Sequence, residues 1–173
     1  MKHKKCWDVI VVGGGHAGIE GALVSSYLGA SVLIITMDKS ALGRMSCNPA
    51  IGGLAKGQIV REIDVLGGSM ARFADSAGIQ FKVLNKTKGR AVWSPRAQVD
   101  KIEYSKFVSK IINENPNIEV IEGEIIDFRI NTFNEIKSAI LRSQDELECN
   151  ALIITAGTFL NGLIHIGNET FSA

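Results

Sequence analysis

Apolar residues near the start of the chain form two short runs, separated by a helical stretch. Residues 8–12 (DVIVV) and residues 31–36 (SVLIIT) are rich in β-branched side chains, which is typical of buried parallel strands. Residues 17–28 between them have the composition of a helix, and Gly29 is placed to end it. The three segments together predict a β–α–β unit.

The next part of the chain mixes small polar residues with regular apolar spacing. We expect residues 37–57, which are rich in Gly, Ser, Asn and Pro, to form a loop. Residues 58–66 have helical spacing, because Ile59, Ile63 and Leu66 fall on one face. This segment is therefore predicted to be an amphipathic helix.

A basic loop and a second helix are expected further along. Residues 79–84 predict a strand, and residues 85–97 (NKTKGRAVWSPRA) predict a loop that carries several cations. Residues 100–115 predict a helix, with Asp100 placed to cap its first turn. Residues 118–121 predict a third short strand.

The pattern of apolar and polar residues changes in the last third of the chain. Residues 125–130, 135–141 and 147–155 alternate or run apolar, with polar turns between them and no long helix. This pattern predicts a β-meander beside the β–α–β core. The fold class is therefore α/β, a Rossmann-type parallel sheet with an inserted β-meander.

Composition narrows the class of protein. The chain has 173 residues, 46% of them hydrophobic and 21% charged, as expected of one globular domain. A net charge of +1 argues against a domain that holds nucleic acid by bulk charge. Cys6, Cys47 and Cys149 form no CxxC pair, which argues against a disulfide framework and a metal site and favours a cytoplasmic location. No apolar run reaches the length of a membrane span, so no membrane association is expected.

The strongest motif follows the first predicted strand. The sequence GGGHAG fits G-x-G-x-x-G, and it opens the first predicted helix, which is the context that dinucleotide binding requires. Gly13 permits the tight turn, Gly15 lets the backbone approach a pyrophosphate, and Gly18 lets the helix pack on the strand. The helix N-terminus then offers free N–H groups to the phosphates. The residues predicted to bind the cofactor here are Gly13, Gly14, Gly15, His16, Ala17 and Gly18. We expect the His16 ring to face the ligand or the neighbouring loop.

Two features decide which dinucleotide is expected. An acidic residue usually ends the second strand and binds the ribose, but Thr36 stands there and Asp38 follows two residues later. The sequence leaves the ribose partner open between them. A plain NAD domain would continue with alternating helices and strands, whereas this chain places a meander before residues 151–158 (ALIITAGT). That arrangement resembles FAD domains of the glutathione-reductase type, so FAD is predicted.

Several segments are specific enough to indicate a family. They are GGGHAGIE (13–20), MSCNPAIGGLAKG (45–57), REIDVLGG (61–68), AGIQFKVLN (77–85), KGRAVWSPRAQVD (88–100) and TAGTFLNGLIHIG (155–167). Together they resemble the MnmG (GidA) family, the flavoprotein subunit of an enzyme that modifies the wobble uridine of certain tRNAs. Proteins of that family are much longer. The resemblance therefore implies that residues 1–173 are the N-terminal portion of an FAD-binding domain.

The resemblance also implies an activity. The family uses FAD, reduced by NADH, and methylenetetrahydrofolate to add an aminomethyl or carboxymethylaminomethyl group to C5 of uridine 34. Glycine or ammonium supplies the nitrogen, and an MnmE-type GTPase is the partner of a homodimer in a heterotetramer. The 173-residue chain alone is expected to be inactive. The alternatives are a folate- and FAD-dependent tRNA uridine methyltransferase of related fold, a truncated fragment without activity, and a plain tRNA-binding module.

One cysteine lies in the most specific of these segments. Pro49 and the pair Gly52-Gly53 would fix the path of the loop around Cys47 and allow close backbone approach to a ligand. In flavoproteins of this fold that loop can lie along the flavin, which suggests Cys47 as a catalytic nucleophile that adds to C6 of uridine. Nearby cations would have to lower its pKa, and Arg44 and Lys56 are close in sequence. The alternative is that Cys47 is a small buried apolar residue.

Basic residues are concentrated in one region. Eight of them lie there, with Trp93 and Tyr104 among them: Lys82, Lys86, Lys88, Arg90, Arg96, Lys101, Lys106 and Lys110. We predict that Lys88, Arg90 and Arg96 contact tRNA, because they lie on a loop beside glycine and proline. The last three lysines are expected to form a solvated face. Ile125, after the third strand, is predicted to hold adenine through its main-chain groups, as in related FAD domains.

Overall fold

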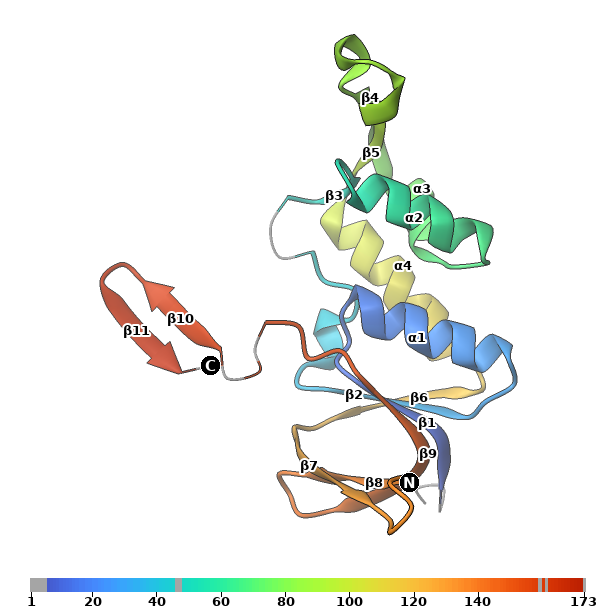
Figure 1. Ribbon diagram of the computed structural model, residues 1–173, viewed down its shortest axis with the longest axis vertical. Helices are drawn as coiled ribbons and strands as arrows, with labels where there is room; N and C mark the ends of the chain where they lie inside the picture. The colour runs from blue at the N-terminus through green and yellow to red at the C-terminus, as the bar shows by residue number, and fades with distance from the viewer. Residues whose placement is uncertain (1–5, 46–47, 159, 161, 173) are drawn as a thin grey trace.

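The computed structural model describes residues 6–45, 48–158, 160 and 162–172. Its centre is a six-stranded sheet in the order β6-β2-β1-β9-β8-β7 (Figure 1). The first four of these strands are parallel, and β8 pairs antiparallel with both β9 and β7. The predicted α/β class is therefore confirmed, with a mixed sheet in which the last strand of the meander joins the parallel part.

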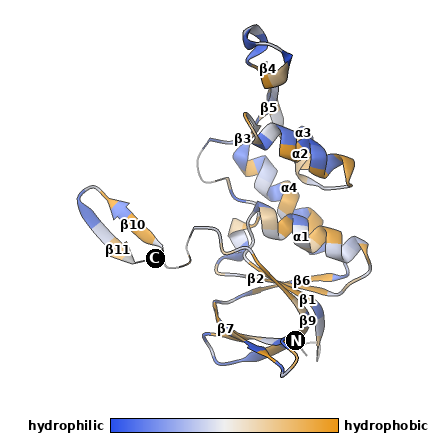
Figure 2. Ribbon diagram, viewed as in Figure 1, coloured by the Kyte–Doolittle hydropathy of each residue, from blue (hydrophilic) through white to orange (hydrophobic). Residues whose placement is uncertain are grey.

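The predicted β–α–β unit forms as expected. It consists of strand β1 (Trp7–Val12), helix α1 (His16–Tyr27) and strand β2 (Val32–Thr36). All five residues of β2 are buried, because the strand is covered on both faces. Strand β6 (Ile118–Glu122) pairs with it in parallel. The apolar colours of Figure 2 follow these central strands.

The predicted meander is also present, as β7 (Ile125–Ile130), β8 (Ile136–Leu141) and β9 (Glu146–Ile154). It covers the sheet face opposite α1, where Leu33 and Ile35 pack with Ala139 and Leu141. Helices cover the other face, where Val11 and Ile34 belong to the larger core cluster. The parallel part of the sheet is thus the middle of three layers, between the helices and the curled meander.

The middle of the chain contains more structure than its composition predicted. A three-stranded antiparallel sheet has the order β3-β5-β4, and its strands are β3 (Ala50–Gly52), β4 (Gly78–Leu84) and β5 (Ser94–Val99). The helices of this part are α2 (Lys56–Val65), α3 (Met70–Ser76), α4 (Lys101–Glu114) and the short η1 (Lys39–Ala41), η2 (Lys86–Lys88) and η3 (Arg90–Val92). Two loop predictions are therefore wrong in part: residues 37–57 contain β3, and residues 85–97 contain the start of β5. Both strands depend on distant partners, which local composition does not reveal.

The buried face of α2 also differs from the prediction. Val60 is buried at 7% exposure, whereas Ile59 is 53% and Leu66 is 85% exposed. Close packing sets this orientation, because a Cβ on Gly57 would lie 2.7 Å from the carbonyl oxygen of Pro95 in β5. The face that contains Gly57 and Val60 is therefore the one that meets the small sheet.

Two further features complete the architecture. Asp100 caps α4 as predicted, since its carboxylate accepts hydrogen bonds from the backbone N–H groups of Ile102 and Glu103. Strands β10 (Leu163–Ile166) and β11 (Glu169–Ser172) form a separate hairpin that projects from the rest of the molecule in Figure 1. Within the described residues, no helix has the length and apolar content needed to cross a membrane.

Candidate functional site

The three motif glycines of the first turn make different contacts. Gly13 has a φ of +105°, and a Cβ there would lie 2.5 Å from the carbonyl oxygen of Thr155. A Cβ on Gly18 would lie 2.0 Å from the carbonyl oxygen of Gly13. In contrast, a Cβ on Gly15 would meet nothing within 4 Å. Gly13 and Gly18 are therefore needed for packing within the protein, whereas Gly15 leaves open space in front of the helix.

The N-terminus of α1 lies beside that space, and no side chain neutralises the partial positive charge of this helix end. Gly15 is the N-cap residue, no side chain caps the helix, and its first turn contains no acidic residue. Helix geometry directs the N–H groups of the first turn outward along the axis, where they carry a partial positive charge. The residues of this turn therefore fit the diphosphate of a dinucleotide.

Backbone hydrogen bonds bring other predicted site residues to the same edge of the sheet. The N–H of Gly13 donates to the carbonyl of Ile35, at 2.8 Å, and the N–H of Gly123 donates to the carbonyl of Thr36, at 2.9 Å. Strands β1, β2 and β6 therefore end together, at the carboxyl edge where ligands bind in open α/β sheets. Ile125 follows at the start of β7, where it pairs with Leu141. Its proposed main-chain contact with adenine stays a prediction.

The two candidate ribose partners have different surroundings. Thr36 is 8% exposed, and its hydroxyl oxygen lies 3.4 Å from the backbone nitrogen of Asp38. The Asp38 carboxylate accepts hydrogen bonds from Ser40 and pairs with Arg44 at 2.9 Å. These hydrogen bonds, with that from the Ser40 hydroxyl the largest cause, lower the pKa of Asp38. Asp38 is thus engaged in shaping η1, while Thr36 lies closest to the glycine turn, next to Gly14.

The His16 ring takes a different direction from the one expected. It packs against Tyr104 of α4, with ring centroids 5.6 Å apart, in the layer between α1, α3 and α4. Its buried Nε2 has no hydrogen-bond partner among the described residues. Burial, with a smaller contribution from the charge of Lys56, lowers the pKa of the ring. The backbone of His16 belongs to the phosphate-binding turn, but its side chain belongs to the helical core.

Glu20 is a structural residue that the sequence did not reveal. Its carboxylate accepts hydrogen bonds from the backbone N–H groups of Ser69, at 2.9 Å, and Met70, at 2.5 Å, at the start of α3. It therefore links the first turns of α1 to α3. No sequence signal connects Glu20 to a segment 49 residues away.

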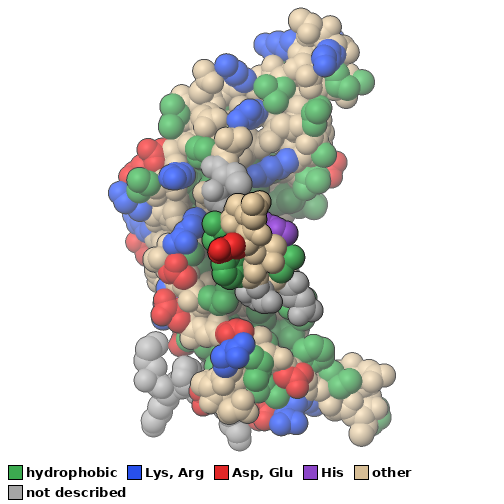
Figure 3. Space-filling model, turned by 90° about the vertical axis from the view of Figure 1, so that its left-hand side faces the viewer, with side chains coloured by type: hydrophobic (Ala, Val, Ile, Leu, Met, Phe, Trp, Pro, Cys, Tyr) green, Lys and Arg blue, Asp and Glu red, His purple; other side chains and the backbone are tan. Residues whose placement is uncertain are grey.

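The predicted tRNA contacts are divided between two places. Lys88 and Arg90 are exposed beyond the end of β4, where the Arg90 guanidinium lies 5.8 Å from the centre of the Trp93 ring. Arg96 lies on β5 and is half-buried, directly opposite Lys82 in the ladder. In Figure 3, Lys and Arg side chains gather over the upper half of the face that is shown. The structure thus places the three residues along one β4–β5 hairpin without bringing them into one cluster.

The predicted catalytic residue, Cys47, lies outside the described residues. Of the two cations near it in sequence, Arg44 is paired with Asp38, and the ammonium group of Lys56 lies 3.5 Å from the carbonyl oxygen of Ala50. Burial lowers the pKa of Lys56. Within the part of the chain that the structure describes, no group of three or more His, Cys, Asp or Glu could hold a metal ion.

Residues 8–173 match the model of the family described as glucose inhibited division protein A. The chain belongs to the GidA family. The MnmG/GidA resemblance is therefore confirmed.

Known members of the GidA family are longer than this chain. The tRNA uridine 5-carboxymethylaminomethyl modification enzyme MnmG of Sulfurihydrogenibium sp. (strain YO3AOP1) is 53% identical over 168 residues, which are 96% of this chain and 27% of that protein. The crystal structure of Aquifex aeolicus GidA (form I) superimposes with a TM-score of 0.90 and 45% identity, and covers 95% of this chain. The GidA chain thus spans about a quarter of the length of the relatives it matches.

A more distant structure shares the fold alone. PqsL, a probable FAD-dependent monooxygenase from Pseudomonas aeruginosa, superimposes with a TM-score of 0.57 and 14% identity, and the match covers 85% of the GidA chain and 41% of PqsL. The likeness confirms that the mixed sheet with its helical layer is an architecture found outside the GidA family.

Proposed function

We propose that the chain is the FAD-binding part of an enzyme that modifies C5 of wobble uridine 34 in tRNA. The enzyme adds a (carboxymethyl)aminomethyl group, with methylenetetrahydrofolate, NADH and glycine or ammonium as co-substrates. Membership of the GidA family and 53% identity to a protein named for this modification support the proposal. We extend it to an MnmE-type GTPase as partner, to a homodimer that assembles with the GTPase into a heterotetramer, and to a cytoplasmic location.

The observation that carries the cofactor assignment is the open space at Gly15. Because a Cβ there would contact no protein atom, this glycine has no packing role of its own, in contrast to Gly13 and Gly18. The uncapped N-terminus of α1 lies beside that space. A diphosphate would accept hydrogen bonds from the N–H groups of Gly15, His16 and Ala17 and would neutralise the helix dipole.

The residues of the chain have distinct parts in the proposed mechanism. FAD, when bound and reduced, supplies a hydride or a one-carbon carrier, which side chains do not provide. The glycine turn would hold the diphosphate, Thr36 would stand near the ribose, and the main chain of Ile125 would face the adenine. Lys88, Arg90 and Arg96 would bind phosphates of the tRNA. Cys47, on sequence grounds alone, is the proposed nucleophile: its thiolate adds to C6 of the uridine, and the electron pair that moves to C5 makes that carbon nucleophilic.

Two glycine substitutions test the cofactor site. Gly15→Ala should weaken FAD binding about tenfold or more, equivalent to about 1.4 kcal/mol, because the new methyl group occupies the space of the diphosphate. The control is Gly21→Ala in the same helix, whose Cβ would sit 3.5 Å from Ile153, an ordinary contact. FAD binding is measured by absorbance titration of each purified chain, and folding by circular dichroism. Equal FAD affinity for parent and Gly15→Ala would refute the assignment of the turn.

A further inference from the structure

A pocket of about 520 Å³ lies between α2, α3 and the β4–β5 hairpin. Its floor is apolar and consists of the buried side chains of Ile51, Val60 and Ala74. Phe81 and Val83 of β4 form one wall, and both remain substantially exposed. None of the lining residues belongs to the glycine turn, so the pocket is separate from that turn.

Positive charge surrounds the pocket. Arg61, Lys82, Lys86 and Arg96 line it, against the single carboxylate of Asp75. Within the described chain, none of these four cations forms an ion pair. Lys82 and Arg96 lie directly opposite each other in the antiparallel ladder, an arrangement of like charges that destabilises a sheet. Side chains alternate between the two faces of a strand, so Lys82 and Arg96 project from the face of the hairpin opposite to Phe81 and Ala97. Arg61 and Lys86 are therefore the cations available to an anion inside the pocket.

The Phe81 ring lies close to the backbone of Gly78. A Cβ on Gly78 would lie 2.3 Å from the Cζ atom of that ring, so the edge of the ring lies over the glycine. The ring is nevertheless 59% exposed and lines the pocket. An aromatic ring that lies against the backbone and is open to solvent can stack on the flat face of a ligand.

Cationic and aromatic side chains also occur along the hairpin beyond the pocket. Arg90 lies over the Trp93 ring, and Lys88 is exposed beside them. No acidic residue occurs between Asp75 and Asp100. Cations and aromatic rings thus follow one another over more of the surface than a single small molecule would cover. This pattern favours a polymeric anion with planar groups, which describes a nucleic acid strand.

We propose that this pocket binds one unpaired base of an RNA strand, stacked on Phe81, with the flanking phosphates on Arg61 and Lys86. The inference rests on the proposed function, because that function makes RNA the substrate. It names a subsite distinct from the glycine turn and adds Phe81 as a residue that contacts the substrate. Unpaired loop nucleotides are the parts of RNA that aromatic side chains recognise in this way.

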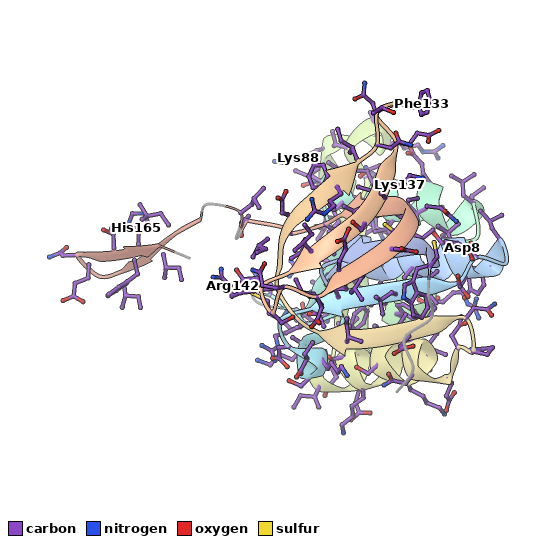
Figure 4. All side chains as sticks on the ribbon, turned by 90° about the horizontal axis from the view of Figure 1, so that it is seen from below. Asp8, Lys88, Phe133, Lys137, Arg142 and His165 are labelled. Atoms are coloured by element: carbon purple, nitrogen blue, oxygen red, sulfur yellow. The ribbon has the colours of Figure 1, made fainter. Side chains whose placement is uncertain are left out.

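The test uses RNA hairpins with 2-aminopurine at one loop position. Titration of the chain, in about 0.1 M salt, should quench the fluorescence as the base stacks. Phe81→Leu keeps an apolar side chain of similar size but removes the aromatic face, and should weaken binding about tenfold and abolish the quenching. Phe81→Tyr should bind like the parent. The matched control is Phe133→Leu, since Phe133 is 82% exposed at the turn between β7 and β8 (Figure 4), at the opposite end of the molecule from β4 (Figure 1).

Three results would overturn the inference. They are equal affinity of parent and Phe81→Leu, equal affinity for a fully paired duplex of the same length, and displacement of the RNA by saturating FAD, which would make the pocket a cofactor site. An FAD titration of Phe81→Leu shows independently that the variant is folded. Normal FAD binding by a chain that binds no RNA refutes the subsite alone, whereas RNA binding through Phe81 without FAD binding refutes the flavin proposal alone.

Discussion

Individual residues of the glycine turn show how one motif serves two purposes. Gly13 and Gly18 are required because backbone atoms of Thr155 and Gly13 occupy the space where their side chains would be. Gly15 is surrounded by open space, and this difference between glycines is invisible in the letters G-x-G-x-x-G. The contrast makes the turn testable one residue at a time.

His16 predicts a dependence of stability on pH. Its folded pKa is lowered by burial, so the folded state prefers the neutral ring. The stabilisation that depends on the neutral ring is complete above the unfolded pKa of 6.5 and is lost as the pH falls toward the folded pKa. The free energy of unfolding, measured with urea, should therefore decrease from pH 7 to pH 5.5. His16→Gln should flatten this dependence.

The control for this experiment is another histidine. His165 is exposed on β10, so His165→Gln is the matched substitution that removes a histidine from outside the helical core. The same decrease in stability in the parent and in His16→Gln would show that other groups control the acid sensitivity.

At the scale of elements, local signals predicted β1, α1, β2 and α4 well. Each of them is specified by residues within a few positions: β-branched runs for the strands, and Asp100 for the start of α4. The sequence predicts β3 and the start of β5 as loop, because only their pairing with each other and with β4 makes them strands. Helix α2 was predicted correctly as a helix, but the contact of Gly57 with β5 determines which face is buried.

Removal of the α4 cap should have a modest and specific cost. Asp100→Ala removes a carboxylate that accepts two backbone N–H groups, and should lower the free energy of unfolding by about 1 kcal/mol. Asp100→Asn retains an acceptor oxygen and should stay close to the parent. Urea unfolding of the three proteins measures the effect, and equal losses for both variants would show that the charge, and not the hydrogen bonds, stabilises the helix.

At the scale of the whole molecule, the sheet joins the first strand, β1, to the last strand of the meander, β9. Trp7 of β1 pairs with Cys149 of β9, and the helical layer and the meander bury the two faces of the sheet. Cys149 is 3% exposed, and burial raises the pKa of its thiol to about 11. Its reactivity therefore depends on the integrity of the entire sheet.

Cys149 should report global unfolding. In a variant that also carries Cys6→Ser and Cys47→Ser, alkylation of the remaining thiol at pH 8 should be about a hundredfold slower than for a free cysteine, because little thiolate is present. Addition of urea should raise the rate in step with the loss of secondary structure. Rapid alkylation without denaturant would show that β9 opens separately from the rest of the sheet.

The sequence by itself determined the features that depend on neighbouring residues. These are the central strands, the glycine turn at the start of α1, the cap of α4, the order of the meander strands and the family resemblance. The tertiary structure alone decided where distant segments meet. In the folded protein the His16 ring packs in the helical core, and the Glu20 carboxylate accepts hydrogen bonds from the start of α3. Lys82 lies opposite Arg96 in the ladder, and the Phe81 ring lies over Gly78. The physical reason is that burial and like-charge repulsion depend on contacts between residues far apart in the chain, which no local pattern encodes.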